Sequence, residues 1–311
     1  MLPHAGTSSR MWREVAALGQ ALARLTEVRG SRVRAQAAIL WDWESFWAQD
    51  LEWRPSEDLS HRERIDAFYD RLWRDGVTTD FAHPEQDLSE YRLVVAPASY
   101  LLTSTAAANL RRYVTGGGTL LVSYFAGIVD EHDAVHVGGF GAPLRDVLGL
   151  TVEEFLPLRE RESVRLVPGD IVGDVWADDI ALEGADVVAA FVDGPAAGKP
   201  AVTRHRLGSG TSWYLATRVD VEGLAAVLGP VYQDAGIALS GLPQELEVVV
   251  RHGADADYAV AINHDEDPVE IPFAGEDLLT GEHSASSFTV SPGTVRVVRT
   301  ASAQGRSPAH R

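Results

Sequence analysis

Apolar and polar positions along residues 35–125 follow the pattern of parallel strands connected by helices. Continuous apolar runs are typical of central parallel strands, and apolar residues three and four positions apart are typical of covering helices. The expected strands are residues 35–41, 77–81, 91–97 and 119–125, and the expected helices are residues 61–74 and 103–114. This alternation predicts an α/β fold with a doubly wound, flavodoxin-like parallel sheet.

A helix is predicted before this sheet, from an N-cap within residues 7–9 to about Val28. Its apolar residues fall three and four positions apart and make one face: Met11, Val15, Leu18, Leu22 and Leu25. Such a face must pack against something, and we expect its partner to lie partly outside this chain. The face then stays exposed as an apolar stripe, which promotes association.

Beyond residue 125 the regular alternation weakens. A helix is expected at residues 221–235, and short strands at residues 164–167, 187–192, 201–207 and 212–217, the last two as a hairpin. After Gly241-Leu242-Pro243, short alternating strands predict a small antiparallel β-sandwich. The predicted division is 1–30, a linker helix; 31–240, an α/β domain; 241–300, a β-sandwich; and 301–311, a disordered tail.

Charge and composition exclude several classes of partner and site. The net charge of −18 over 311 residues argues against nucleic acid and anionic membranes, because phosphate groups would be repelled. The chain has no cysteine, which excludes disulfides, thiolate zinc sites and a cysteine nucleophile. No stretch approaches the roughly 18 apolar residues of a membrane span, and residues 1–10 lack a signal-peptide core, so a cytoplasmic location is expected.

Tryptophan and acidic residues gather where the first strand of the sheet is expected to end. Within AAILWDWESFWAQDLEW, residues 37–53, the tryptophans are Trp41, Trp43, Trp47 and Trp53. Open α/β sheets place their sites at this carboxyl edge. The rings could stack on a sugar, fill a pocket in a partner subunit, or cap the core of their own domain. The residues alone leave these three interpretations open.

Asp42 and Glu44 form a carboxylate pair beside these rings. Two residues apart on one strand, they would point to the same face. Retaining glycosidases hold two carboxyl groups about 5–5.5 Å apart, so a role as acid and nucleophile is conceivable. The two carboxyl groups of a catalytic pair usually come from different strands, so that one can be desolvated while the other stays in contact with water. Hydrogen bonding that stiffens the loop is the favoured interpretation.

Other candidate motifs are weaker. The three glycines at 116–118 precede a strand and fit a helix C-cap better than a phosphate loop. Ser123 ends a strand, but its context VSYFAG lacks the strained Gly-x-Ser-x-Gly elbow of a nucleophile. His132, Asp133 and His136 lie in a segment without a helical face, where a solvated loop is favoured over zinc. No metal site and no cofactor are therefore predicted.

Several longer motifs carry a family resemblance. The segment MLPHAG at residues 1–6, Arg13-Glu14, and ILWDWES at residues 39–45 resemble the part of family 42 glycoside hydrolases, the β-galactosidases, that leaves the catalytic barrel and enters the second domain. The similarity continues through YRLVVAPASYLLT and YVTGGGTLLVSYFAG. It ends in DLLTG at residues 277–281, which resembles that family's last domain. The resemblance covers nearly the whole chain.

The resemblance implies an α/β domain of amidotransferase-like fold that mediates trimer formation. It also implies that both catalytic glutamates sit on a (β/α)₈ barrel, which needs about 250 residues that this sequence does not supply. No catalytic residue is therefore carried over to this chain. Since the family's active sites lie close to subunit contacts, we expect Trp41, Asp42, Trp43, Glu44 and Trp47 to border a neighbour's sugar site or a subunit interface.

The function expected from this resemblance is that of a non-catalytic oligomerisation and C-terminal region. The parent reaction is hydrolysis of terminal β-D-galactosides with retention, and the isolated chain should not turn over. The expected partners are further copies in a homotrimer or a barrel-bearing subunit, with a galactoside at a subunit boundary. One alternative is a stand-alone saccharide-binding module that uses Trp43 and Trp47. Another, an amidase-like hydrolase, is disfavoured by the missing cysteine and elbow.

Overall fold

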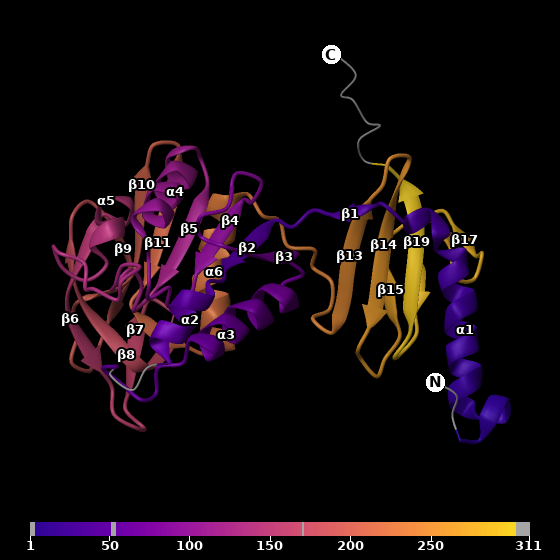
Figure 1. Ribbon diagram of the computed structural model, residues 1–311, viewed down its shortest axis with the longest axis horizontal. Coiled ribbons are helices and arrows are strands. Elements are labelled where there is room, and N and C mark those ends of the chain that lie inside the picture. Colours follow the sequence, from indigo (N-terminus) through magenta and orange to yellow (C-terminus); the bar gives the residue numbers. More distant parts are fainter. Residues whose placement is uncertain (1–3, 51–53, 170, 303–311) are drawn as a thin grey trace, which may run out of the picture. The chain divides into compact units, whose positions relative to one another are not determined.

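The computed structural model describes residues 4–50, 54–169 and 171–302. The chain folds into two compact units, Ala35–Leu239 and Met1–Arg34 with Ser240–Arg311, here called the α/β unit and the C-terminal unit (Figure 1). Each unit has a sheet and a hydrophobic core of its own. Among the described residues, no helix is long and apolar enough to cross a membrane.

Five parallel strands form the centre of the α/β unit. They lie in the order β3, β2, β4, β5, β11, and every adjacent pair is parallel. In chain order this is 2-1-3-4-5, the flavodoxin-like arrangement, so the predicted fold class is confirmed. The bounds are β2 (Ala37–Leu40), β3 (Thr79–Ala82), β4 (Leu93–Ala96), β5 (Thr119–Ser123) and β11 (Gly210–Leu215).

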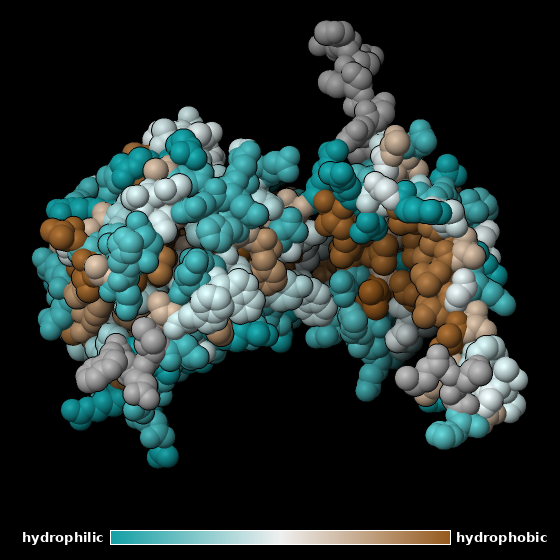
Figure 2. All heavy atoms as spheres, in the orientation of Figure 1, coloured by the Kyte–Doolittle hydropathy of each residue, from teal (hydrophilic) through white to brown (hydrophobic). Residues whose placement is uncertain are grey.

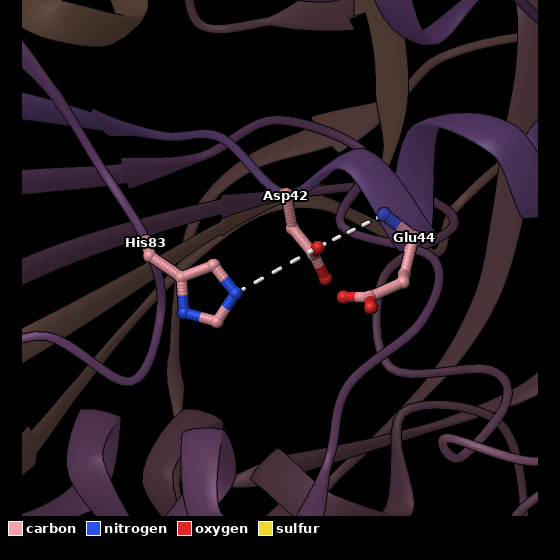
Figure 3. A group of neighbouring side chains, drawn as sticks. All are labelled: Asp42, Glu44 and His83. Atoms are coloured by element: carbon pink, nitrogen blue, oxygen red, sulfur yellow. Dashed lines mark hydrogen bonds and ion pairs between the residues drawn. The ribbon is translucent and has the colours of Figure 1, made fainter.

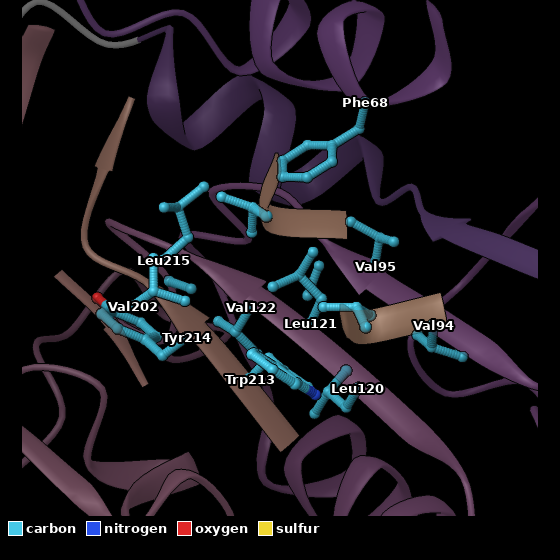
Figure 4. Close-up of a cluster of buried hydrophobic side chains, with 14 of the residues drawn as sticks. Phe68, Val94, Val95, Leu120, Leu121, Val122, Val202, Trp213, Tyr214 and Leu215 are labelled. Carbon is cyan, nitrogen blue, oxygen red and sulfur yellow. The ribbon is translucent and has the colours of Figure 1, made fainter. Parts of the chain in front are cut away.

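Helices cover this parallel core. α3 (His61–Arg74) packs against α6 (Val221–Ala235), and α4 (Ser104–Thr115) contacts β5 and β11. Figure 4 shows Phe68 of α3 among the buried side chains of β4, β5 and β11. The predicted bounds of α3 and α6 are confirmed. Their ends are marked in the sequence: the Ser60 hydroxyl accepts the Glu63 N–H at the start of α3, and Gly236 (φ 63°) ends α6.

Antiparallel strands extend the sheet beyond β11. The hairpin of β10 (Pro200–Leu207) and β11 was predicted, as were β7 (Ser163–Val167) and β9 (Asp186–Phe191). The sequence did not reveal β6 (Leu150–Pro157) or the long β8 (Ile171–Leu182), which pair with each other, nor β12 (Thr217–Val219) as a separate strand. β8 escaped detection because Asp174, Asp178 and Asp179 interrupt its apolar pattern and its backbone is irregular at Val175 (φ 64°).

The C-terminal unit is the predicted small antiparallel sandwich. Its main sheet has the order β1-β13-β14-β19-β16-β17, and β15 and β18 form a second layer. Apolar side chains between the two layers fill its core, with Ile271, Phe288 and Val290 from β15 and β18 against Ala259, Ala261 and Val298. The bounds are β1 (Arg32–Val33), β13 (Leu246–His252), β14 (Ala256–Asn263), β15 (Val269–Ile271), β16 (Gly275–Asp277), β17 (His283–Ser284), β18 (Phe288–Val290) and β19 (Val295–Ala301).

The N-terminal helix α1 (Arg10–Arg24) belongs to the C-terminal unit. The Ser9 hydroxyl caps it by accepting the Trp12 N–H. None of its residues is buried, and its apolar side chains are 58–62 % exposed: Met11, Val15, Leu18 and Leu22. The predicted exposed stripe is therefore confirmed for these four residues, whereas Leu25, predicted on the same face, is partly buried against the sheet. The segment predicted as a disordered tail lies, from residue 303 on, outside the described residues.

Candidate functional site

The tryptophan segment follows β2 and forms a short helix, α2 (Trp43–Gln49). Asp42 is its N-cap, and the Asp42 carboxylate accepts the Glu44 N–H at 3.0 Å. The prediction that Asp42 and Glu44 lie on one strand is wrong, because Asp42 is the N-cap of α2 and Glu44 lies in its first turn. An acidic N-cap followed by Trp43, Phe46 and Trp47, at helical spacing, was the signal that could have revealed α2.

His83 joins the two carboxylates at the carboxyl edge of the sheet. It follows β3, and the parallel register of Leu40 with Ala82 brings it beside Asp42. Its Nε2 lies 3.7 Å from Asp42 Oδ1, and donor atoms of Asp42, Glu44 and His83 lie within 4.8 Å of one another (Figure 3). Asp42 is 8 % exposed, whereas Glu44 is exposed. Sequence reasoning missed His83, because its position depends on the pairing of β2 with β3.

The hydrogen bond that His83 Nδ1 accepts argues against a metal site at this cluster. Two carboxylates and an imidazole are suitable metal ligands. However, His83 Nδ1 accepts the Glu85 N–H at 3.3 Å, which in neutral imidazole places the ring proton on Nε2, towards Asp42. A metal-bound histidine instead keeps the lone pair for the metal and donates its other N–H. The Asp42 carboxylate therefore caps the start of α2 through the Glu44 N–H, with the His83 ring beside it at 3.7 Å.

The carboxylate pair does not have the arrangement of a glycosidase site. Asp42 and Glu44 both come from the start of one short helix. An acid and a nucleophile must instead flank the bond of a sugar that lies between them. The geometry therefore gives this pair no role as acid and nucleophile.

Exposed rings surround the cluster and form what we call the aromatic surface. Its members are Trp41, Trp43 and Trp47 together with Tyr69 of α3 and Phe81 of β3. Each ring contacts the next one along the surface. The ring centroid of Trp43 lies 6.0 Å from that of Trp47 and 5.0 Å from that of Trp41. The Trp41 centroid lies 6.1 Å from that of Phe81, which stacks on Tyr69 at 5.7 Å. Four of the five rings are 41–60 % exposed. Sequence reasoning missed Tyr69 and Phe81.

The tryptophans of this surface differ in environment. Trp41 is half-buried, packs against the core and stacks on Phe46 at 5.7 Å, so it caps the core. Trp43 and Trp47 are 54 % and 60 % exposed and face solvent. Trp53 lies outside the described residues. The core-capping interpretation thus applies to Trp41, while Trp43 and Trp47 are available for contacts.

Beneath this surface two polar side chains at the carboxyl edge of the sheet are buried. His61 is buried, its Nδ1 lies 3.1 Å from the Ala98 carbonyl oxygen, and burial lowers its pKa to about 4, which leaves it neutral at pH 7. Ser123 is fully buried, and its hydroxyl accepts the Ala98 N–H at 2.9 Å. A side chain so enclosed cannot reach a substrate in solvent.

At this edge the structure contains two residues with left-handed backbone conformation that the sequence did not reveal. Phe125, two residues after Ser123, adopts a left-handed backbone conformation (φ 59°), as does Ala98 (φ 44°). A strained turn of this kind is where α/β hydrolases hold a nucleophile. Here the Phe125 ring is buried against Tyr100, Phe155 and Trp176. The turn therefore exists but carries a packing residue in place of a reactive one.

The remaining candidate motifs have structural explanations. Gly116 caps α4, and its N–H donates to the Arg112 carbonyl, as predicted. The glycines line a groove of about 860 Å³ at the amino edge of the sheet, opposite to the edge where such sheets bind ligands. His136 Nε2 lies 3.0 Å from the Leu102 carbonyl. Within the described part of the chain, His132, Asp133 and His136 do not gather into a metal-sized group.

Comparisons with known proteins match both units. Residues 35–238 match the family model described as "Beta-galactosidase trimerisation domain", and residues 245–300 match "Beta-galactosidase C-terminal domain". A β-galactosidase of Arthrobacter sp. is 38 % identical over 300 residues, which are 96 % of this chain and 43 % of that protein. BgaB, a β-galactosidase of Geobacillus sp. (strain Y412MC61), is 40 % identical over 86 % of this chain and 40 % of its own length.

Solved structures agree with these matches. The β-galactosidase from Bacillus circulans sp. alkalophilus has a TM-score of 0.91 and 30 % identity, covering 96 % of this chain and 46 % of that chain. The β-galactosidase from Rahnella sp. R3 has a TM-score of 0.85 and 29 % identity, covering 96 % and 46 %. The chain thus spans less than half the length of each of these four β-galactosidases.

Proposed function

Because the chain belongs to the family 42 β-galactosidases and comprises their trimerisation and C-terminal domains, we propose that its α/β unit joins copies into a homotrimer. The observation that supports this proposal is the aromatic surface, which lies in the unit that matches the trimerisation model. Aromatic residues are enriched in subunit interfaces, where they dominate the binding energy. A closed ring of three copies uses two different patches of each subunit, so this surface would face a second patch on its neighbour.

The site residues Trp41, Asp42, Trp43, Glu44 and Trp47 are proposed to lie at that subunit boundary. Trp43 and Trp47 supply exposed apolar area, and the Asp42–His83 pair fixes the helix that carries them. Since the relatives are β-galactosidases, we propose that the parent reaction is retaining hydrolysis of terminal β-D-galactosides. Its catalytic carboxylates would belong to a barrel-bearing region outside these residues.

The trimer proposal is tested by the oligomeric state. Size-exclusion chromatography with light scattering is expected to give three copies for the wild-type chain, and a smaller species for the double variant Trp43→Ala/Trp47→Ala. Val137→Ala, which alters an apolar residue that is 99 % exposed elsewhere in the α/β unit, is the matched control and should leave the trimer unchanged. A monomeric wild type, or a double variant that stays trimeric, would contradict the proposal.

The non-catalytic role is tested with a chromogenic β-galactoside. The purified chain should show no turnover above a buffer blank. Appreciable hydrolysis that disappears in Asp42→Ala or Glu44→Ala would overturn this part of the proposal, since it would assign the chemistry to these two carboxylates.

A saccharide-binding module is the second candidate, because polar groups border the exposed rings. Trp43 lies between Asp42 and Glu44 in the chain, and ligand atoms of these two carboxylates lie within 4.8 Å of a ring nitrogen of His83. A sugar needs both a flat ring and hydrogen-bonding groups. Calorimetric titration with galactose and lactose discriminates: binding heat that Trp43→Ala removes supports this candidate, and no heat for either sugar rejects it. The expected cytoplasmic location stays a prediction, which cell fractionation would test.

A further inference from the structure

The groove beside the three glycines lies along one face of α4, within the α/β unit. One wall is the segment between β3 and β4, and the other is α4 with the glycine turn that follows it. The end of α6 also lines the groove. Its volume of about 860 Å³ falls within the range of about 300–1,000 Å³ that is typical of small-molecule sites. None of the lining residues belongs to the aromatic surface, so the groove is a separate feature.

Two arginine side chains in the groove are held in place by the fold. Arg112 Nη2 donates to Asn109 Oδ1 at 2.8 Å. Asn109 is itself buried, and its amide nitrogen donates to two carbonyl oxygens of the segment between β3 and β4. Arg92 Nη1 donates to the Gly236 carbonyl oxygen at 2.7 Å. A guanidinium carries five N–H donors, so both arginines keep donors for a ligand.

Two carboxylates line the same groove and supply acceptors. Glu85 Oε1 accepts the Thr103 hydroxyl at 2.6 Å, and Asp87 Oδ1 accepts the Ser89 N–H at 3.0 Å. Hydrogen bonds from Ser89 and the nearby positive charge of Arg112 hold the pKa of Asp87 below its usual value, so this carboxylate is ionised at pH 7. A carboxylate has about four lone-pair sites, so each one keeps the capacity to accept from a ligand.

The charges that line the groove balance each other, because its charged residues are Arg92, Arg112, Glu85 and Asp87. An anion would meet the two carboxylates, and the net charge of −18 acts against it as well. A cation would meet the two arginines. A hydroxyl group both donates and accepts, so it can bridge a carboxylate and a guanidinium. A neutral ligand with several hydroxyl groups therefore suits all four side chains.

The uncharged lining also suits a sugar ring. Tyr91 is half-buried and lines the groove, and aromatic side chains offer an apolar face with a polar tip. Gly117 leaves open space beside its backbone, since a Cβ built there has Ser209 Cβ, at 3.9 Å, as its nearest contact. The missing side chain keeps this end of the groove accessible.

We propose that this groove binds a neutral saccharide of one or two sugar units. Arg92 and Arg112 donate to its hydroxyl oxygens, and Glu85 and Asp87 accept from its hydroxyl groups. All four side chains are exposed, so water competes with the ligand for each hydrogen bond. The expected affinity is therefore weak, with a Kd on the order of 1 mM.

Saturation-transfer difference NMR of the full chain with lactose tests this site. The wild-type chain is expected to give a lactose signal that saturates on titration. Arg112→Met and Arg92→Met each remove a guanidinium and retain an unbranched side chain. Each should raise the Kd about tenfold, because hydrogen bonds from a charged group to the sugar are lost.

Arg111→Met is the matched control. Arg111 precedes Arg112 in α4, is also exposed, and pairs with Asp146, which does not line the groove. This variant should leave the Kd unchanged, and thermal unfolding shows that each variant is folded. A wild-type chain that does not bind lactose would overturn the proposal. Binding that survives both Arg92→Met and Arg112→Met would overturn it as well.

Two further variants separate this site from its alternatives. Trp43→Ala should leave the Kd for lactose unchanged; if it removes binding, the sugar lies at the aromatic surface and the proposal is wrong. Asp87→Asn should weaken lactose binding, because an ionised acceptor is lost, whereas an anion would bind more tightly without that charge. Inorganic phosphate is therefore titrated under the same conditions and should not displace lactose. Phosphate binding that Asp87→Asn strengthens would make the groove an anion site and reject the saccharide.

Discussion

The two units leave different kinds of surface exposed. The aromatic surface of the α/β unit combines exposed rings with a carboxylate–imidazole cluster. The outer face of the C-terminal sheet, which β15 and β18 do not cover and which we call the apolar surface, is aliphatic at its centre: Val249, Val260, Ile262, Val295 and Val297. Figure 2 shows hydrophobic atoms gathered over β13, β14 and β19. Rings with polar neighbours tolerate water and suit contacts that are specific and partly wet. An aliphatic face gains only by excluding water. The comparison predicts that contact with water is less favourable for the outer face of the C-terminal sheet than for the aromatic surface.

The units also differ in how they bury a carboxyl group. Asp178 in the α/β unit and Asp277 in the C-terminal unit are both fully buried. Burial raises the pKa of Asp178 to about 7, because only the neutral donors of Trp176 and Tyr214 oppose it. Burial also acts to raise the pKa of Asp277, but hydrogen bonds from Thr280, Arg296 and two backbone N–H groups outweigh it and lower that pKa. A larger set of hydrogen-bond donors, led by the Thr280 hydroxyl and including the Arg296 cation, therefore reverses the direction of the shift.

The largest expected effect is a difference in the free energy of unfolding between substitutions on the two faces of the C-terminal sheet. Val298→Asp places a charge in the core and should destabilise this unit by about 3–5 kcal/mol. Val260→Asp, the same substitution on the uncovered face, should cost less than about 1 kcal/mol in the chain alone. Hydrogen exchange of the β14 amides under increasing urea measures the free energy of unfolding of this unit in both variants. Equal destabilisation would mean that the apolar surface is already covered, and would break the comparison.

The second prediction concerns pH and the α/β unit. The folded pKa of Asp178 lies above its unfolded value, so the folded state binds the proton more tightly. Stability of this unit should therefore fall as pH rises from about 4 to about 7, by at most about 4 kcal/mol. Urea unfolding followed by tryptophan fluorescence reports this slope. Asp178→Asn should flatten it and Asp179→Asn should not; a slope that survives Asp178→Asn assigns the effect to another group.

The third prediction concerns the cation in the C-terminal unit. Arg296→Met leaves the Asp277 carboxylate buried without its charged donor, and should destabilise this unit by about 1.5–3 kcal/mol at pH 7. In the wild type, the lowered pKa of Asp277 supplies stability above about pH 4 that is lost as pH falls further. Hydrogen exchange of β19 as a function of pH measures this loss. A unit that gains stability on acidification would contradict the assigned direction.

The smallest effect is expected at the start of α2. Asp42→Ala removes the N-cap and should destabilise α2 by about 1 kcal/mol, while Asp42→Asn keeps an acceptor for the Glu44 N–H. Fluorescence quenching of the exposed tryptophans by acrylamide should increase in Asp42→Ala and stay near wild type in Asp42→Asn. An equal increase in quenching in both variants would mean that the charge of Asp42 beside His83, and not the N-cap hydrogen bond, holds the helix that carries the aromatic surface.

Much of the fold could be predicted because its strands and helices carry local signals. The buried runs of β2, β4 and β5 and the caps Ser60 and Gly236 are visible in the sequence. The family and the sandwich were also predicted correctly from motifs and alternation. The amidotransferase-like character and the homotrimer stay predictions.

What escaped prediction depends on packing between distant residues. His83 reaches Asp42 only through the register of β2 with β3, and Phe81 meets Tyr69 only through the packing of α3 against β3. The uncovered face of the C-terminal sheet has the same alternation as a covered one, so the sequence does not tell which side lacks a second layer. Residue 125 is a phenylalanine and not a glycine, the residue that usually indicates a positive φ, so the sequence gives no sign of this left-handed turn.

That turn has a consequence for attempts to engineer the α/β unit. A bulky residue with positive φ carries a conformational cost of about 1–3 kcal/mol, which its contacts with Tyr100, Phe155 and Trp176 offset. Replacing the ring by a small reactive side chain would remove those contacts and keep the unfavourable backbone. Any design that grafts a nucleophile onto this scaffold therefore has to rebuild the aromatic packing around residue 125 first.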